Sequence, residues 1–173
     1  MTDNNYRIEV IKDFKQTISI LPGNKPDMIG NCLHDIYCVY YKERGNDNNT
    51  AASAIIDKYG LKEAFINQKE ILTSVANLYD YLENTYGEAQ SIYHELPFQY
   101  TNDGQIVRGN IDLLWEVPQG VILVDYKSGE SKAEAYGPQI DCYKEALYKA
   151  GKVIIDSLLY NAVKGIIVKS VKI

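Results

Sequence analysis

Two apolar segments separated by a turn dominate the middle of this sequence. Residues 111–117 and 121–124 are rich in branched and aromatic side chains, and Pro118-Gln119-Gly120 lies between them. Branched and aromatic residues favour extended backbone, whereas a turn containing proline and glycine interrupts it. The sequence therefore predicts a β-hairpin formed by strands at about 105–117 and 120–127. This hairpin decides which charged residues of the segment can meet.

Three charged residues of chemical interest lie in the hairpin. Asp125 and Lys127 are two residues apart, so on a strand their side chains share one face. Asp112 reaches that face from the neighbouring strand if the register allows it. Two carboxylates are hard oxygen ligands for Mg²⁺ or Mn²⁺, and the lysine would then lie against an attacking water. Together the three residues indicate phosphodiester cleavage.

A purely structural interpretation competes with this one. Charged residues at strand ends are common, so each carboxylate alone could be solvated or paired with Lys127. An unpaired buried carboxylate is costly, however, and three charged groups converging on apolar strands favour a functional site. In the following helix, Gln139 and Tyr143 lie four residues apart and could face the site. On that helix alone, an exposed Gln139 and a core Tyr143 are the simpler interpretation.

The rest of the chain predicts helices before the hairpin and a mixture of elements after it. Asp27 is the expected N-cap of a first helix, Gly45 to Asn49 a polar loop, and residues 129–133 a second loop. Further helices are expected at 50–58, 62–85 and 134–150, and strands within 6–20 and at 91–100, 153–161 and 165–172. The pattern predicts an α/β or α+β fold with a helical N-terminal part, in one domain over residues 1–173.

Composition narrows the class of protein. The hydrophobic fraction of 46% and the charged fraction of 24% are typical of a soluble globule. No segment is long and apolar enough to cross a membrane, and the N-terminus lacks a secretory pattern. The three cysteines, Cys32, Cys38 and Cys142, cannot all pair and form no C-x-x-C couple. Reduced thiols and a cytoplasmic location are therefore expected.

The net charge of −5 limits how this chain can bind nucleic acid. Non-specific affinity for DNA comes largely from lysine and arginine, so an acidic chain is a poor binder on its own. A metal ion can still approach one phosphate while a larger basic partner supplies most of the affinity. A module of a larger machine is therefore favoured.

Five short motifs follow one another along the chain. They are Gly30-Asn31-Cys32-Leu33-His34, Glu95-Leu96-Pro97-Phe98, Gly109-Asn110-Ile111-Asp112, Asp125-Tyr126-Lys127 and Tyr136-x-x-Gln139-x-x-x-Tyr143. In this order they resemble the RecB-type branch of the PD-(D/E)XK nuclease superfamily. The resemblance covers about residues 26–150, and the ordered set is much more specific than D-x-K alone. The resemblance implies a restriction-endonuclease-like mixed central sheet flanked by helices.

The resemblance also implies roles for individual residues. It assigns Mg²⁺ or Mn²⁺ to His34, Asp112, Asp125 and the carbonyl of Tyr126, and the activation of water to Lys127. It adds two further site residues from the helix after the hairpin, Gln139 and Tyr143. Glu95 fits the E-x-P strand motif as a supporting residue. His94 matches no motif and is expected at the surface.

The function implied is a metal-dependent DNA nuclease, an exonuclease or end-processing module acting with helicase domains. Several RecB-like nucleases carry four cysteines for an iron–sulfur cluster, but the three cysteines here lie elsewhere, so no cluster is expected. Two alternatives stay open. One is a non-catalytic DNA-binding or scaffolding module on a nuclease fold. The other is a stand-alone nuclease of a restriction or mobile-element system.

Overall fold

The computed structural model describes residues 6–129 and 133–173 of the chain. Within them lie six strands and four α-helices, with short 3₁₀ turns at Lys42–Arg44 and Lys62–Ala64. None of the described helices is long and apolar enough to cross a membrane. The elements are β1 (Tyr6–Asp13), α1 (Pro26–Val39), α2 (Asp47–Lys58), α3 (Gln68–Tyr86), β2 (Ser91–Asn102), β3 (Gln105–Val117), β4 (Gly120–Lys127), α4 (Ala133–Lys149), β5 (Ile154–Asn161) and β6 (Ile166–Lys172).

The six strands form one sheet in the order β1-β6-β5-β4-β3-β2. Strands β4 and β5 pair in parallel, and all other neighbours pair antiparallel. Helix α4 makes the crossover between the two parallel strands, as a parallel pair requires. The predicted mixed sheet flanked by helices is therefore confirmed.

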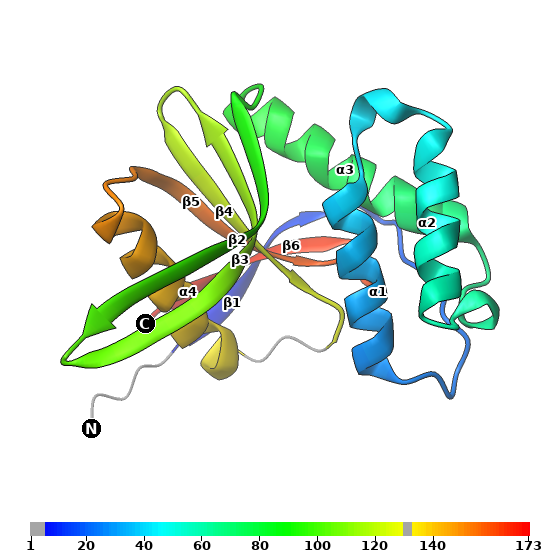
Figure 1. Cartoon of the computed structure of the whole chain (residues 1–173), viewed down its shortest axis with the longest axis horizontal. Helices are drawn as coiled ribbons and strands as arrows, with labels where there is room; N and C mark the ends of the chain where they lie inside the picture. The colour runs from blue at the N-terminus through cyan, green and yellow to red at the C-terminus, as the bar shows by residue number, and fades with distance from the viewer. Residues whose placement is uncertain (1–5, 130–132) are drawn as a thin grey trace.

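Helices cover both faces of the sheet. Helices α1, α2 and α3 lie together on one side, and α4 lies on the other (Figure 1). Along β4, Val121 and Leu123 pack toward α4, whereas Ile122 and Val124 pack toward α1–α3. Both faces of β4 are thus buried, which is why residues Val121 to Val124 are all apolar. The alternation brings Asp125, the next residue, to the α4 side.

Strands β3 and β4 separate near the end of β4. Their ladder ends at the pair Leu113 and Val124, although β3 continues to pair with β2 as far as Gln105. The β2–β3 hairpin consequently swings away from the last residues of β4 (Figure 1). We call this point, beyond Leu113 and Val124, the β3–β4 fork. It opens a gap in the sheet at the position of Asp112 and Asp125.

Several predicted boundaries differ from the structure. The helix expected at 62–85 starts only at Gln68, because Phe65 and Asn67 are extended and the Asn67 side chain accepts a hydrogen bond from the Lys69 amide. Helix α1 starts at Pro26, ahead of the expected cap, and α2 extends into the expected loop. Gly87 ends α3 as predicted. In the expected loop 129–133, residues 130–132 lie outside the described residues.

Helix α4 lies close to β1 at Gly137. A Cβ added there would overlap the Tyr6 ring, whose hydroxyl donates a 2.7 Å hydrogen bond to Asp141. Alanine normally stabilises a helix by about 1 kcal/mol relative to glycine, but overpacking costs about 1–3 kcal/mol. The middle of these values leaves a net loss, so we expect Gly137→Ala to lower the free energy of unfolding by about 1 kcal/mol in urea denaturation.

The control is Gly129→Ala, because a Cβ at Gly129 meets nothing within 4 Å. In a Tyr6→Leu background the loss caused by Gly137→Ala should shrink, since the smaller side chain relieves the overlap. Equal stability of Gly137→Ala and the parent would contradict this packing.

Candidate metal and active site

Asp112 lies at the β3–β4 fork and joins three elements. Its Oδ2 accepts a 2.6 Å hydrogen bond from the backbone amide of Tyr126 on β4. Its Oδ1 lies 3.2 Å from Nε2 of His34 on α1. The carboxylate thus pairs with a β4 amide at the point where the β3–β4 ladder has ended.

The buried Asp125 forms an ion pair with the partly exposed Lys127 on the α4 side of β4. Asp125 is 1% exposed, and its Oδ2 lies 2.6 Å from the Lys127 ammonium nitrogen. Among the described residues this oxygen has no well-aligned hydrogen bond, so its partner is a charge rather than a directed donor. Burial, followed by the charge of Asp112, raises the pKa of Asp125 to about 6, although Lys127 opposes the shift.

Helix α4 supports the lysine. Gln139 Oε1 accepts a 2.9 Å hydrogen bond from Lys127, and Gln139 Nε2 donates one of 2.6 Å to the Tyr143 hydroxyl. The ring of Tyr136 lies 4.6 Å from the ammonium. Burial and then the charges of Asp125 and Asp112 raise the pKa of Tyr143, so its phenol stays protonated. The lysine is therefore held from three sides.

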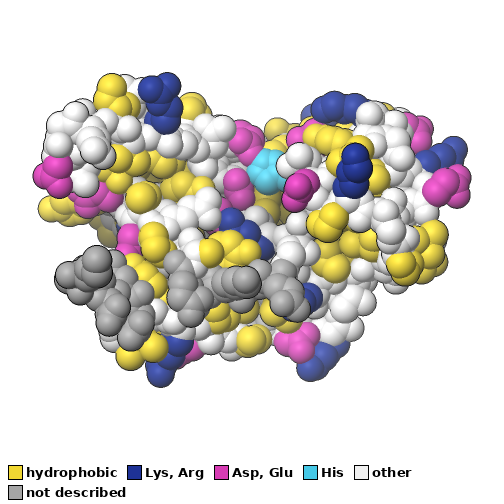
Figure 2. Space-filling model, turned by 90° about the horizontal axis from the view of Figure 1, so that it is seen from below, with side chains coloured by type: hydrophobic (Ala, Val, Ile, Leu, Met, Phe, Trp, Pro, Cys, Tyr) yellow, Lys and Arg dark blue, Asp and Glu magenta, His cyan; other side chains and the backbone are white. Residues whose placement is uncertain are grey.

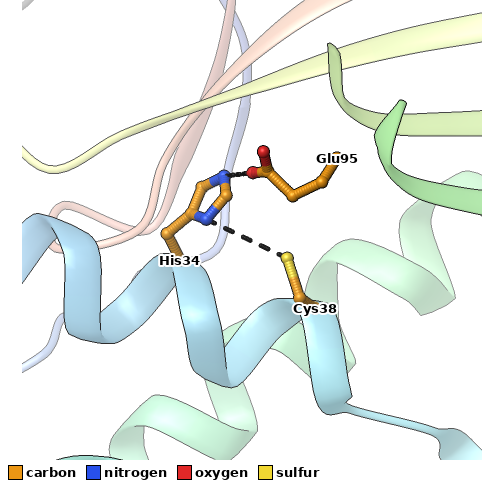
Figure 3. A group of neighbouring side chains, drawn as sticks. All are labelled: His34, Cys38 and Glu95. Carbon is orange, nitrogen blue, oxygen red and sulfur yellow. Dashed lines mark hydrogen bonds and ion pairs between the residues drawn. The ribbon is translucent and has the colours of Figure 1, made fainter. Parts of the chain in front are cut away.

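His34 is contacted by two carboxylates at one nitrogen and a thiol at the other. Its Nε2 lies 2.7 Å from Oε1 of Glu95 on β2, and its Nδ1 lies 3.9 Å from Sγ of Cys38 (Figure 3). Burial alone would lower the pKa of His34, but the hydrogen bonds to Asp112 and Cys38 raise it to about 10. In the metal-free protein a protonated imidazole thus takes the place of a cation among the carboxylates.

Glu95 reaches the histidine because its backbone departs from the regular strand. Its φ is +50°, and the ladder between β2 and β3 skips it, with His94 paired to Leu113 and Leu96 to Ile111. A non-glycine residue at positive φ is uncommon and costs about 1–3 kcal/mol, and such strain concentrates at functional sites. The Asn110 side chain donates a 3.1 Å hydrogen bond to Oε2 of Glu95.

A cavity of about 960 Å³ opens above these groups. Its walls come from α1, β2, β3, β4 and α4, and they include His34, Glu95, Asp112, Asp125, Lys127 and Gln139. Figure 2 shows acidic side chains around a histidine, with basic side chains below, where this face of the molecule is hollowed.

Helix α1 approaches the end of β4 very closely at Gly30. A Cβ added at Gly30 would lie 2.7 Å from Oγ of Ser128, the residue after Lys127. The absence of a side chain therefore lets the helix lie against the strand end. His34 follows one turn later and so faces the cavity.

The comparison with known families decides the identity of this fold. The sequence pattern of the PD-(D/E)XK nuclease superfamily matches residues 6–166. The chain belongs to the PD-(D/E)XK nuclease superfamily. The predicted family is therefore confirmed, and the match covers every element that lines the cavity.

The relatives of this PD-(D/E)XK chain include much longer proteins. It is 34% identical over 80 residues to an ATP-dependent helicase/nuclease subunit of Thermoanaerobacter sp. (strain X514), covering 42% of this chain and 6% of that protein. It is 37% identical over 82 residues to the protein of the same name from Clostridium novyi (strain NT), covering 42% and 7%. The chain thus spans only a small part of these relatives. Protein VC1899 from Vibrio cholerae, at 9% identity, 76% and 48% coverage and a TM-score of 0.30, is too distant to support any argument.

The donors present in the cavity fit a divalent cation. Carboxylates and a neutral imidazole are suitable ligands for Mg²⁺ or Mn²⁺. Oδ2 of Asp125 is buried without an aligned donor, and the Asp112 and Glu95 carboxylates converge on Nε2 of His34. A cation placed there would satisfy oxygens that a proton on His34 now satisfies.

The structure brings the predicted side chains of this PD-(D/E)XK chain together. His34, Asp112, Asp125, Lys127 and Gln139 line one cavity, and the buried Tyr143 contacts Gln139 from behind. Sequence reasoning missed Asn110, which holds Glu95, and the only signal for it was its place in the glycine motif before Asp112.

One expectation about a histidine was wrong. His94 was expected at the surface, but it is half-buried, and its Nε2 lies 3.1 Å from the Tyr79 hydroxyl. The cause is the packing of β2 against α3, which covers this part of the strand.

The pKa values of His34 and His94 test the charges around each imidazole, because the two are expected to shift in opposite directions. In metal-free protein, NMR titration should show His34 with a pKa well above 6.5 and His94 with a pKa below it, because burial lowers the latter. Asp112→Asn removes the main partner that raises the His34 pKa, so that pKa should fall toward 6.5 while His94 stays low. Stability contributed by protonated His34 is present below pH 6.5 and lost as the pH rises through about 10. A parent His34 that titrates near 6.5 would contradict this geometry.

Proposed function

We propose that this chain is a divalent-metal-dependent DNA nuclease that hydrolyses phosphodiester bonds. The observation that supports it most directly is the meeting of Asp112, Asp125 and His34 beside Lys127 at the β3–β4 fork, at the base of an open cavity. When bound, Mg²⁺ or Mn²⁺ would polarise the scissile phosphate and lower the pKa of a bound water.

Each residue has a defined part in this proposal. His34, Asp112, Asp125 and the backbone carbonyl of Tyr126 hold the metal. Lys127 orients the attacking water and stabilises charge that develops on the phosphate. Its ammonium needs a fixed position for this, which the contacts with Asp125 and Gln139 supply. Gln139 and Tyr143 are positioning residues that act through the lysine or a phosphate oxygen.

The proposed setting is a larger DNA-processing machine. The names of the relatives describe ATP-dependent helicase/nuclease subunits, and this chain matches only a small part of them. The net charge of −5 also suits a module that relies on a partner for DNA affinity. We therefore propose end-processing or exonuclease action in the cytoplasm, with helicase domains in the same or a partner chain.

Isosteric replacement of the metal-binding carboxylate tests the assignment. Asp125→Asn keeps the shape of the side chain but removes its charge, so we expect Mn²⁺-dependent cleavage of DNA to fall by at least about 100-fold. Asp80→Asn is the matched control, since Asp80 is half exposed and pairs with Lys42 far from the cavity residues. Circular dichroism should show the same fold for all three proteins.

Two results would contradict this assignment. One is Asp125→Asn protein that cuts DNA as fast as the parent. The other is a parent that shows no metal binding by calorimetry at millimolar Mn²⁺, which would favour a non-catalytic scaffold.

The form of the substrate distinguishes the mode of action. Linear and circular DNA, single- and double-stranded, are incubated with Mg²⁺, Mn²⁺ or EDTA and separated on gels. We expect loss of linear DNA with either metal, intact circles, and no cleavage in EDTA. Cleavage of circles would instead show endonuclease action and favour the stand-alone nuclease.

A further inference from the structure

Cys38 has no part in the proposed reaction, yet it lies beside a metal-binding histidine. It follows His34 by four residues on α1, so the two side chains share one face of the helix. Its free thiol is partly buried, and its Sγ lies 3.9 Å from Nδ1 of His34 (Figure 3). Glu95 contacts the other nitrogen of this imidazole, Nε2, from β2.

Two of these donors, Sγ of Cys38 and Nδ1 of His34, have the spacing of neighbouring ligands in a tetrahedral metal site, and Glu95 lies close enough to supply a third ligand by turning its side chain from Nε2. One donor atom from each of His34, Cys38 and Glu95 lies within 4.8 Å of the other two. Bonds of about 2.3 Å from zinc to sulfur and 2.0–2.1 Å to nitrogen place the two donors about 3.6 Å apart at a tetrahedral angle. The observed 3.9 Å between Sγ and Nδ1 is within a few tenths of that value.

We propose that His34, Cys38 and Glu95 form a second site, selective for thiophilic divalent cations such as Zn²⁺, whose occupation inhibits the nuclease. The thiol of Cys38 loses its proton to solvent when the ion binds, and the three protein ligands leave a fourth position for water. Mg²⁺ does not take this site, because it prefers oxygen ligands, whereas thiolates select softer metals.

The inhibition follows from ligands shared between the two sites. Glu95 lies 2.7 Å from Nε2 of His34, the nitrogen that also faces Asp112. An ion held by Sγ of Cys38 and Nδ1 of His34 takes up Glu95 when that carboxylate turns from Nε2, and this removes Glu95 from the cation proposed at Asp112 and Asp125. The inhibition rests on the proposed nuclease function, but binding of the soft metal does not.

The other two cysteines provide a built-in control. Cys32 is fully buried in the core between the helices and the sheet, and Cys142 lies on α4 across the sheet from α1. Within the described residues, Cys38 is the cysteine whose sulfur approaches a histidine nitrogen. Cys142→Ser therefore makes the same chemical change as Cys38→Ser, but at a position away from His34.

Cobalt spectroscopy tests the site without reference to activity. Full-length reduced protein is titrated with Co²⁺, which gives a near-ultraviolet charge-transfer band when a thiolate is a ligand. The band is expected in the parent and in Cys142→Ser, and Zn²⁺ should bleach it. It should be missing in Cys38→Ser and in Cys38→Ala, and thermal unfolding of both variants shows that they are folded. Competition with a chromogenic chelator should show that these two variants bind Zn²⁺ at least about 10-fold more weakly than the parent.

The activity assay then tests inhibition. Micromolar Zn²⁺ added to Mn²⁺-supported cleavage should inhibit the parent and Cys142→Ser more than either Cys38 variant, each compared with its own zinc-free rate. A cobalt band that survives in folded Cys38→Ser, or a parent without a band, overturns the site. Equal inhibition of all four proteins overturns the inhibitory role. A parent that shows the band but does not cut DNA would refute the nuclease function and leave the site intact.

Discussion

The hydrogen bond from the Tyr126 amide to Asp112 is the interaction on which the site depends. It forms where the ladder between β3 and β4 stops, so a carboxylate takes the place of the next strand-to-strand partner. Beyond that point β4 keeps its parallel pairing with β5 through Lys127, and β3 keeps its pairing with β2. Both sides of the cavity are therefore held by strand pairing, and the acidic pair can stay close without support from flexible loops.

The close approach of Asp112 and Asp125 is electrostatically unfavourable in the metal-free protein. Asp125 is almost fully buried next to Asp112, and its raised pKa records the cost of that charge. The pKa of His34 is raised for the complementary reason. The neighbouring Asp112 carboxylate stabilises the protonated, positively charged imidazole. A fold selected only for stability would place apolar groups at the end of β4, as it does at Val121 to Val124. The break in that pattern at Asp125 is a mark of function.

Local pattern was enough to predict the part of the site that lies close together in sequence. The period-two spacing of Asp125 and Lys127 and the turn at Gly120 follow from strand geometry, and the structure has both. The contact between His34 and Glu95 depends on the position of α1 over the sheet and on a positive φ in β2, which no spacing rule reports. His94 shows the same limit, because it contacts Tyr79 on α3, and that contact depends on how α3 packs against β2. The late start of α3 shows another limit, since residues 62–67 form a short 3₁₀ turn at Lys62–Ala64 followed by extended backbone at Phe65 and Asn67.

The formal charges of the site are those expected of a site that binds a divalent cation. Glu95, Asp112 and Asp125 carry three negative charges, and Lys127 with a protonated His34 carries two positive ones, so the metal-free site is negative by one. A divalent cation that displaces the His34 proton brings it to neutrality, and a second cation would make it positive. A phosphate, which is itself anionic, is therefore repelled until metal is bound. In the proposed nuclease, the ion that polarises the scissile phosphate would therefore also remove this repulsion, while affinity for the rest of the DNA is left to a partner.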